Sequence, residues 1–140
     1  MIAYVDSSVI LRLVLHQEGR LAEWRRIETA VTSALTTVEC HRTLQRRHHR
    51  ELLASADLVT RREIVSQLIE RMERTQITPN ILRRAAEPFP LPLGSLDAIH
   101  LASALAWEAA NGTMDRIAFA THDVELGRAA NACGLTVLGV

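Results

Sequence analysis

Short apolar segments alternate with longer amphipathic ones along the chain, and this alternation restricts the possible folds more than any other feature of the sequence. Strands that alternate with helices predict an α/β fold, an open parallel sheet with helices on both faces. Near-continuous apolar strands fit a sheet that is covered on both faces. The expected strands are IAYV (2–5), VTSAL (31–35), IAFAT (117–121) and LTVLGV (135–140), with QIT (76–78) as a short additional candidate.

Helices are expected between these strands, and the segment at 95–112 is the clearest of them. Ser95 is a favourable residue at a helix start, and Gly112 favours termination. Small side chains such as Ala98 and Ala102 permit this helix to pack closely on a sheet. The other expected helices cover residues 7–16, 20–30, 36–53, 57–75, 79–87 and 123–134, and the proline-rich segment 88–94 is expected to be a loop.

The length of 140 residues and an apolar content of 48% indicate one compact domain over residues 1–140. No apolar run approaches the length of a membrane span, and no signal peptide is visible, so we expect a cytoplasmic protein without membrane contact. Cys40 and Cys133 lie far apart and form no CxxC pair, so they are expected to be reduced, buried residues.

The charge composition excludes several kinds of chemistry. The formal net charge is zero, so the chain has no global attraction to nucleic acids. All sixteen basic residues are arginine, and there is no lysine. P-loop nucleotide binding, Schiff-base catalysis and a receiver-domain site all depend on lysine and are therefore excluded.

Acidic residues follow several predicted strands near the point where the next helix begins. Asp6 follows the first strand, Asp123 follows IAFAT, and Glu39 and Asp97 lie near the starts of two helices. In a parallel sheet the carboxyl ends of the strands lie along one edge, where ligands bind. At least three of these acids, and all four in the simplest arrangement, should therefore point into one crevice. A fifth acid, Asp115, precedes a strand and should lie at the opposite edge.

Each of the four acids also has a structural explanation. Asp6 and Asp123 can cap helices, Glu39 can form a capping box with Thr36, and Asp97 can complement a helix dipole. Four carboxylates in one crevice would nevertheless repel one another unless a cation neutralised them. A hard divalent ion such as Mg²⁺ or Mn²⁺ suits an all-oxygen site.

Polar residues beside the acids are candidates for supporting roles. Ser7, Ser8 and Thr121 can orient carboxylates or water, although turn and cap chemistry explains them equally well. A histidine ligand would favour zinc or manganese. We instead interpret His100 as a packed helix residue and His122 as a loop side chain.

Four motifs together resemble a known family. DSS (6–8) follows the first strand, TTVEC (36–40) opens a helix, LDAIHLASAL occupies residues 96–105, and THD (121–123) follows a late strand. This pattern is similar to that of PIN-domain ribonucleases, and within them to the VapC toxins of bacterial toxin–antitoxin pairs. The resemblance covers the whole chain, and LDAIHLASAL is its most specific part. One small departure is His122, where many relatives carry an unlike polar residue.

The resemblance implies a sheet with strand order 3-2-1-4-5 and an acidic pocket that holds one or two Mg²⁺ or Mn²⁺ ions. It implies an endoribonuclease toxin that cleaves single-stranded or structured RNA. A VapB-type antitoxin as inhibitor and a homodimeric state are implied as well. Carried over by position, the catalytic and metal-ligating residues are Asp6, Glu39, Asp97 and Asp123, with Ser7 and Thr121 as supporting hydroxyls.

The implied chemistry is hydrolysis of a phosphodiester by a metal-activated water. This route leaves a 5′-phosphate and a 3′-hydroxyl and needs no covalent nucleophile. The densest basic cluster, HRTLQRRHHRE at 41–51, lies on the same predicted helix as Glu39. Arg42 and Arg46 are therefore candidate RNA ligands, with a solvated helix face as the alternative explanation.

Two other functional interpretations remain open at this point. A phosphatase of the haloacid-dehalogenase type also places acids at strand ends, but it needs an acid at position 8, where this chain has Ser8. A non-catalytic PIN-like module would bind RNA or protein without cutting. Degenerate sites usually lose acids, whereas this chain retains all four, so the nuclease is the favoured interpretation.

Overall fold

A parallel sheet of five strands forms the centre of the molecule, with strand order β3-β2-β1-β4-β5. The computed structural model describes residues 1–111 and 116–140. The predicted parallel sheet and its order 3-2-1-4-5 are therefore confirmed. The strands are β1 (Ile2–Val5), β2 (Thr29–Ser33), β3 (Glu73–Thr75), β4 (Ala118–Ala120) and β5 (Thr136–Leu138).

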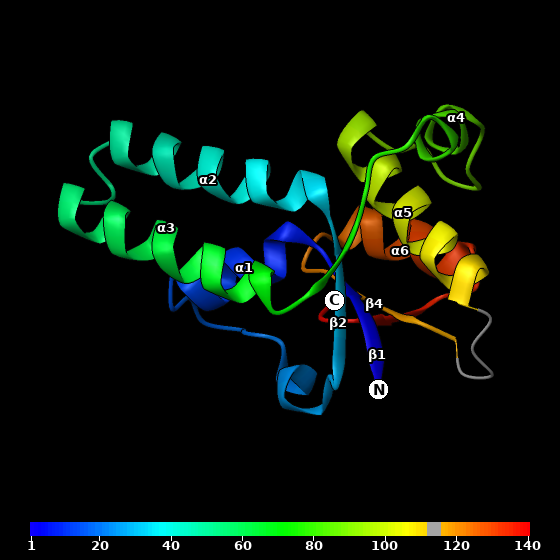
Figure 1. Cartoon of the computed structure of the whole chain (residues 1–140), viewed down its shortest axis with the longest axis horizontal. Helices are drawn as coiled ribbons and strands as arrows, with labels where there is room; N and C mark the ends of the chain where they lie inside the picture. The colour runs from blue at the N-terminus through cyan, green and yellow to red at the C-terminus, as the bar shows by residue number, and fades with distance from the viewer. Residues whose placement is uncertain (112–115) are drawn as a thin grey trace.

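Six α-helices and one short 3-10 helix connect the strands in the described chain (Figure 1). Their order follows the alternation expected from the sequence. The helices are α1 (Ser7–Val14), the 3-10 helix η1 (Ala22–Arg26), α2 (Ala34–His49), α3 (Ser55–Glu70), α4 (Pro79–Ala86), α5 (Ser95–Asn111) and α6 (Val124–Ala132).

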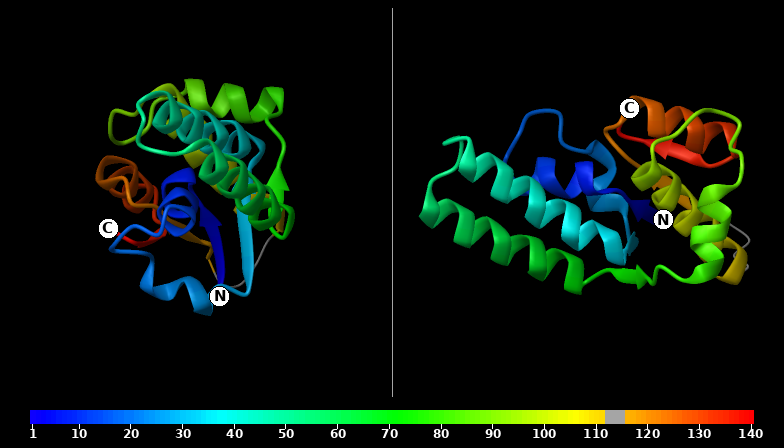
Figure 2. Two further views of the ribbon diagram at one scale, coloured as in Figure 1. Left: turned by 90° about the vertical axis from the view of Figure 1, so that its left-hand side faces the viewer. Right: turned by 90° about the horizontal axis from the view of Figure 1, so that it is seen from above.

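Helices cover both faces of the sheet, because successive side chains of a strand point to opposite sides. On β1, Val5 packs in a core with Ile10 of α1 and Leu44 of α2. Its neighbour Tyr4 packs in the other core, which includes Leu101 of α5. The prediction of a doubly covered sheet is confirmed. Helices α2 and α3 form a long antiparallel pair that extends beyond the sheet (Figures 1 and 2).

The register brings the carboxyl ends of the central strands together. Val5 of β1 pairs with Ala120 of β4, and the Asp6 amide then donates to the Ala120 carbonyl at 3.0 Å. The Thr121 amide continues the same edge by donating to the carbonyl of Leu138 at 3.0 Å. Asp6 and Thr121 therefore leave neighbouring strands at the same height.

One predicted helix start is wrong. Ser33, not Thr36, caps α2 by accepting a hydrogen bond from the Leu35 amide at 3.1 Å. Thr36 lies inside the helix and is buried, and its hydroxyl pairs with that of Thr32 at 2.8 Å. The capping box therefore does not form. Glu39 lies in the second turn of α2, and its carboxylate is not used for capping.

Other boundaries also differ from the expectation. The third strand is Glu73–Thr75 rather than 76–78. Its position is set by pairing with β2, which the local composition does not reveal. The segment at 20–30 forms only the short η1. Helix α5 includes Ser95 instead of beginning after it. Gly112 and Asp115 lie outside the described residues. None of the described helices is long and apolar enough to cross a membrane.

Candidate metal site

Asp6 is the first residue after β1, and its buried carboxylate is held by surrounding hydroxyl groups. Oδ2 accepts hydrogen bonds from the hydroxyls of Ser8 at 2.6 Å and Thr121 at 3.0 Å. Oδ1 accepts a longer bond from the Ser7 hydroxyl at 3.4 Å. The residue is only 5% exposed, and burial of a carboxylate is tolerated when its oxygens are hydrogen-bonded. Asp6 also caps α1 through the Ser8 amide, as its local position predicts.

Glu39 reaches the same crevice from α2 and meets His100 of α5. The Nε2 atom of His100 lies 2.5 Å from Oε2 of Glu39 and 3.7 Å from Oδ1 of Asp6. The other ring nitrogen, Nδ1, is 2.8 Å from the hydroxyl of Tyr4. His100 is only 1% exposed, so both of its ring nitrogens are satisfied inside the protein.

The surroundings of His100 favour its charged form. Burial acts to lower the pKa of His100, but the hydrogen bond with Glu39 and the negative charges of Asp6, Glu39 and Asp97 hold it above the usual value. His100 is a packed, buried residue of α5, as interpreted from the sequence, but its contacts go beyond packing. It lies among the acids and connects Glu39 to the centre of the sheet.

Thr121 links Asp6 to the acid at the start of α6. Its hydroxyl donates to Asp6 and accepts a hydrogen bond from the Asp123 amide, each at 3.0 Å. Asp123 caps α6, and its Oδ1 accepts from the amides of Glu125 and Leu126, both at 2.9 Å. The capping role that the sequence permits is therefore real, and it uses only one carboxylate oxygen.

Asp97 lies in the first turn of α5 and is half-buried near the other acids. Burial raises the pKa of Asp97, and the negative charges of Asp123, Asp6 and Glu39 raise it further, while His100 acts in the opposite direction. The structure thus brings all four predicted acids close enough to influence one another. Their mutual repulsion is the electrostatic condition that a bound cation would relieve.

The donor set fits a divalent cation. One ligand atom each from Asp6, Glu39 and His100 lies within 4.8 Å of the other two. Asp97 and Asp123 are not part of this close group, and the structure relates them to it through their charges. Oxygen-rich surroundings suit Mg²⁺ or Mn²⁺. Both ring nitrogens of His100 are already engaged, by Glu39 and Tyr4, so His100 would position Glu39 and not ligate the ion.

The candidate RNA-binding arginines lie beside this site. A hollow of about 250 Å³ is bordered by Ser7 and Glu39 from the acidic crevice and by Arg42 and Arg46 from the next turns of α2. Both arginines are exposed. Arg46 donates to the Thr43 hydroxyl at 2.7 Å, which directs it along the helix surface.

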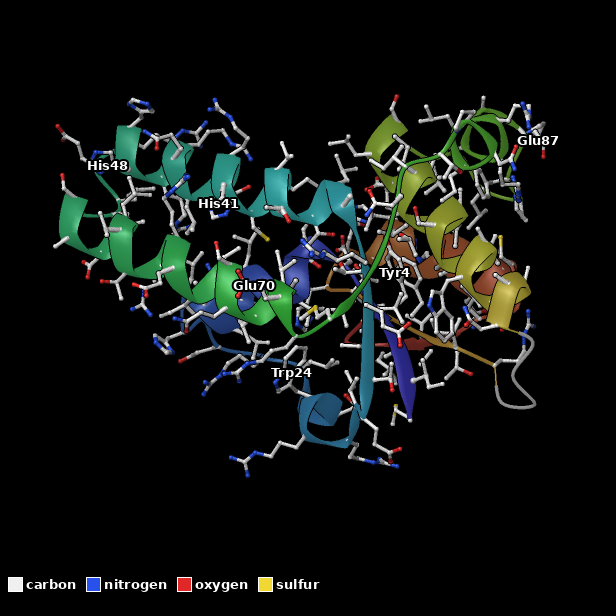
Figure 3. All side chains as sticks on the ribbon, in the orientation of Figure 1. Tyr4, Trp24, His41, His48, Glu70 and Glu87 are labelled. Atoms are coloured by element: carbon white, nitrogen blue, oxygen red, sulfur yellow. The ribbon has the colours of Figure 1, made fainter. Side chains whose placement is uncertain are left out.

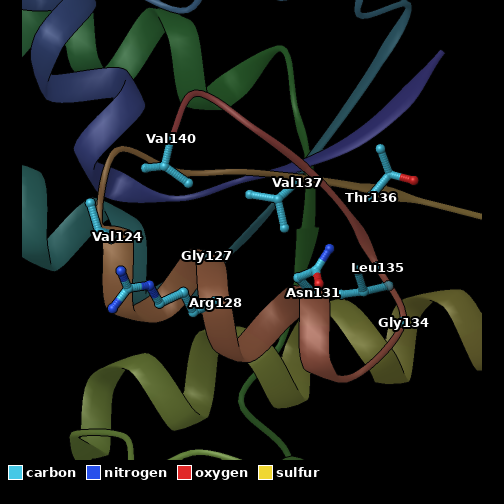
Figure 4. A pocket seen from close by; sticks show the side chains of 9 residues that line it. All are labelled: Val124, Gly127, Arg128, Asn131, Gly134, Leu135, Thr136, Val137 and Val140. Carbon is cyan, nitrogen blue, oxygen red and sulfur yellow. The ribbon is translucent and has the colours of Figure 1, made fainter.

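A second hollow lies between α6 and β5, with a volume of about 760 Å³ (Figure 4). Its walls are mainly small and aliphatic, with Arg128 and Asn131 as the larger polar groups. No carboxylate lines this hollow in the described chain, so acid or metal chemistry belongs to the crevice around Asp6.

The cysteines and His122 are outside this chemistry. Burial, followed by the charges of Glu39 and Asp6, raises the pKa of Cys40 to about 12, so its thiol is protonated at neutral pH. Cys133 is only partly buried, in contrast to the expectation, and both cysteines are free thiols. His122 lies in the loop before α6, with Nδ1 at 2.8 Å from the Gly139 carbonyl, as a loop residue should.

Sequence reasoning missed the supporting pair of Tyr4 and His100. The available signal was the spacing of Asp97 and His100, which lie three residues apart and so share one face of α5. Tyr4 carried no comparable signal, because a tyrosine in an apolar strand is usually a core residue.

Comparisons with known proteins agree with this geometry. The family model of the PIN domain matches residues 3–131. A curated relative from Mycobacterium tuberculosis, named ribonuclease VapC35, is 32% identical over 141 aligned residues, which cover 96% of this chain and 94% of the relative.

Solved structures show the same fold at lower sequence identity. A toxin–antitoxin complex from Klebsiella pneumoniae matches with a TM-score of 0.62 and 15% identity, covering 88% of each chain. VapBC2 from Rickettsia felis, bound to a DNA fragment from its promoter, matches with a TM-score of 0.62 and 14% identity, covering 98% of this chain and 97% of the other. The family model and the curated relative show that the chain belongs to the PIN-domain family, among the VapC-type proteins.

Proposed function

We propose that this protein is a metal-dependent endoribonuclease that acts as the toxin of a VapBC-type pair. The observation that carries the proposal is the gathering of Asp6 and Glu39 beside His100, with Asp97 and Asp123 close enough for their charges to act on one another. Within the described residues, none of these four acids forms an ion pair with an arginine. A purely structural role would not require this repulsion. A nuclease site requires it, because the acids must hold cations beside a phosphodiester.

Asp6, Glu39, Asp97 and Asp123 are the residues that would hold Mg²⁺ or Mn²⁺. When bound, the cation supplies positive charge for the phosphate and lowers the pKa of water. Ser8 and Thr121 keep the Asp6 carboxylate in one orientation through short hydrogen bonds to Oδ2. Their hydroxyls therefore support the site in the manner of groups that orient metal ligands.

Glu39 has a second role in the proposed reaction. Its Oε2 is engaged by His100, which fixes the direction of the carboxylate. Oε1 can then accept a hydrogen bond from the attacking water and orient it toward phosphorus. The products would carry a 5′-phosphate and a 3′-hydroxyl, since the 2′-hydroxyl of RNA takes no part.

RNA must approach through the side of the crevice that carries positive charge. Arg42 and Arg46 border the hollow that also contains Glu39, so they can pair with phosphates while the acids remain available to the cation. We therefore keep both arginines as RNA ligands in the proposal.

The cellular setting is proposed from the relatives. Structures of toxin–antitoxin proteins share this fold, which supports a VapB-type antitoxin as inhibitor. A homodimer and a cytoplasmic location belong to the same proposal.

The proposal is tested by incubating total cellular RNA with the purified, antitoxin-free protein. We expect discrete products with Mg²⁺ or Mn²⁺ and none with chelator or with the Asp6→Asn variant. Asp57→Asn is the matched control, because it removes an equal charge from an exposed position in the first turn of α3. Its activity should equal that of the parent.

Folding of each variant is checked by circular dichroism before its activity is compared. A folded parent that cleaves no RNA with either metal would favour the non-catalytic RNA- or protein-binding module. Cleavage that survives Asp6→Asn would show that the active site lies elsewhere or that a contaminant cuts the RNA.

A further inference from the structure

Another hollow, lined mainly by polar residues and with a volume of about 360 Å³, lies between α2 and α3. It is separate from the acidic crevice and has no role in the proposed chemistry so far. In Figure 3 the His41 side chain extends from α2 toward α3. The lining residues are Thr37, Val38, His41, Arg42 and Gln45 of α2 and Arg62 of α3.

The lining of this hollow consists of hydrogen-bond donors and positive charge. Two guanidinium groups, an imidazole, an amide and a hydroxyl face it, and no carboxylate does. Within residues 1–111 and 116–140, neither Arg42 nor Arg62 takes part in a side-chain hydrogen bond or an ion pair. Neither guanidinium is therefore paired directly with a carboxylate in the described residues.

His41 supplies a second observation that points to a missing partner. Its Nδ1 atom is shielded from solvent and has no hydrogen-bond partner in the described part of the chain. Burial lowers the pKa of His41, and the positive charge of Arg62 lowers it further. Shielded polar atoms are usually satisfied, so an unpaired nitrogen beside two unpaired arginines indicates a place for an anion.

The hollow continues into the proposed active site. Val38 and Arg42 line both this hollow and the one that contains Ser7 and Glu39. Arg42 follows Glu39 by three residues, or about one helical turn, which corresponds to a rise of about 4.5 Å along the axis. The hollow between α2 and α3 therefore adjoins the one that contains Glu39, with Arg42 on the border between them.

We propose that the hollow between α2 and α3 is a phosphate-binding subsite for the RNA backbone, next to the phosphate that is cut. The inference rests on the proposed function and extends it from the acidic crevice to this pair of helices. Arginine forks match phosphate oxygens in paired hydrogen bonds, and Thr37 and Gln45 can add neutral donors. Among the described lining residues there is no Phe, Tyr or Trp, so the subsite would position RNA mainly through its phosphates.

The test measures binding of a short single-stranded RNA by fluorescence anisotropy. The parent protein carries Asp97→Asn and is kept in Mg²⁺, so that binding is separated from cleavage. Arg62→Gln in this background should raise the Kd about tenfold and reduce the slope of log K against log salt by about 0.7. Arg62→Lys should restore the slope, because it restores the charge.

Arg25→Gln is the matched control. It removes the same charge from an exposed position on η1, at the amino end of the sheet (Figure 1). Its Kd and salt slope should equal those of the parent. A loss of similar size in both variants would mean that only net charge matters, and the subsite would be refuted.

The location of the phosphate is tested with RNAs that carry one neutral methylphosphonate linkage. A methylphosphonate at one position of the RNA should weaken binding to the parent but not to Arg62→Gln, because the variant has already lost the contact with that phosphate. Additive effects at every position would overturn the subsite. In the enzyme with Asp97 intact, Arg62→Gln should raise KM and leave kcat unchanged.

Two further outcomes separate the possible failures. If the parent binds no RNA, the proposed function fails and the subsite fails with it. If the parent binds RNA and Arg62→Gln changes neither Kd nor slope, the subsite alone is refuted. A glutamate-rich peptide that binds only when Arg62 is present, with RNA binding unchanged, would assign the hollow to an acidic protein segment and overturn the proposal.

Discussion

The Tyr4→Phe variant isolates the buried hydrogen bond that connects the centre of the sheet to the acidic crevice. The Tyr4 hydroxyl lies 2.8 Å from Nδ1 of His100. The Tyr4 ring stacks on Phe119 with a centroid distance of 5.2 Å, and Tyr4 is fully buried. Phenylalanine retains the ring and its packing, so the variant removes only the hydroxyl and opens no large cavity.

The expected cost follows from what the missing hydroxyl leaves behind. Nδ1 of His100 becomes a buried polar atom without a partner, which costs about 1–3 kcal/mol. For a domain of this size, about 2 kcal/mol should lower Tm by roughly 6–10 °C. His100 also becomes less firmly oriented, so its hold on Glu39 weakens and Mg²⁺ affinity should fall about tenfold.

The assay combines urea denaturation with a double-mutant cycle. The free energy of unfolding is measured for the parent, for Tyr4→Phe, for His100→Leu and for the double variant, all in chelator. The coupling energy between the two positions should be at least about 1 kcal/mol, because either single change breaks the same bond. A coupling near zero, together with an unchanged denaturation midpoint for Tyr4→Phe, would refute the proposed connection.

Three further outcomes follow from the same contacts. Thr121→Val should lower the free energy of unfolding by about 1–3 kcal/mol in urea, because Asp6 loses a donor; an unchanged midpoint would contradict this. Since the folded-state pKa values of His100 and Asp97 are both raised, their stabilising contributions are complete below the unfolded-state values of 6.5 and 3.8 and are lost as the pH rises through the raised values. Metal-free protein should therefore lose stability from pH 6.5 upward in calorimetry, and Mg²⁺ should reduce this loss; a flat profile in chelator would oppose it. Cys40, with its pKa raised to about 12, should react with iodoacetamide only after unfolding, as followed by mass spectrometry, and rapid labelling of the folded protein would contradict its burial.

The fold was predictable because its signals are local. Each strand is a short apolar run, and each helix has its own apolar stripe, so the order of elements follows from neighbouring residues. The exceptions lie where local signals compete. Threonine is a suitable N-cap residue, but Ser33 precedes Thr36 and caps the helix, so Thr36 lies inside α2.

The candidate acids were predictable for a topological reason. Parallel strands end at one edge, so Asp6 and Asp123 had to emerge near each other once β1 and β4 were neighbours. Glu39 and Asp97 join them because α2 and α5 also begin at that edge. The same logic does not describe how each carboxylate is hydrogen-bonded, which depends on side-chain directions.

The order of strands and helices and the approximate positions of the four acids could be predicted from the amino-acid sequence, because both depend on residues close together in the chain. The contacts of His100 could not be predicted in this way, since its partners Glu39 and Tyr4 lie 61 and 96 positions away. The hollow between α2 and α3 was also not predictable, because Arg62 of α3 lines it together with residues of α2. Such contacts depend on how elements pack across the sheet, and hydrophobic periodicity records which face is buried but not which distant side chain it meets.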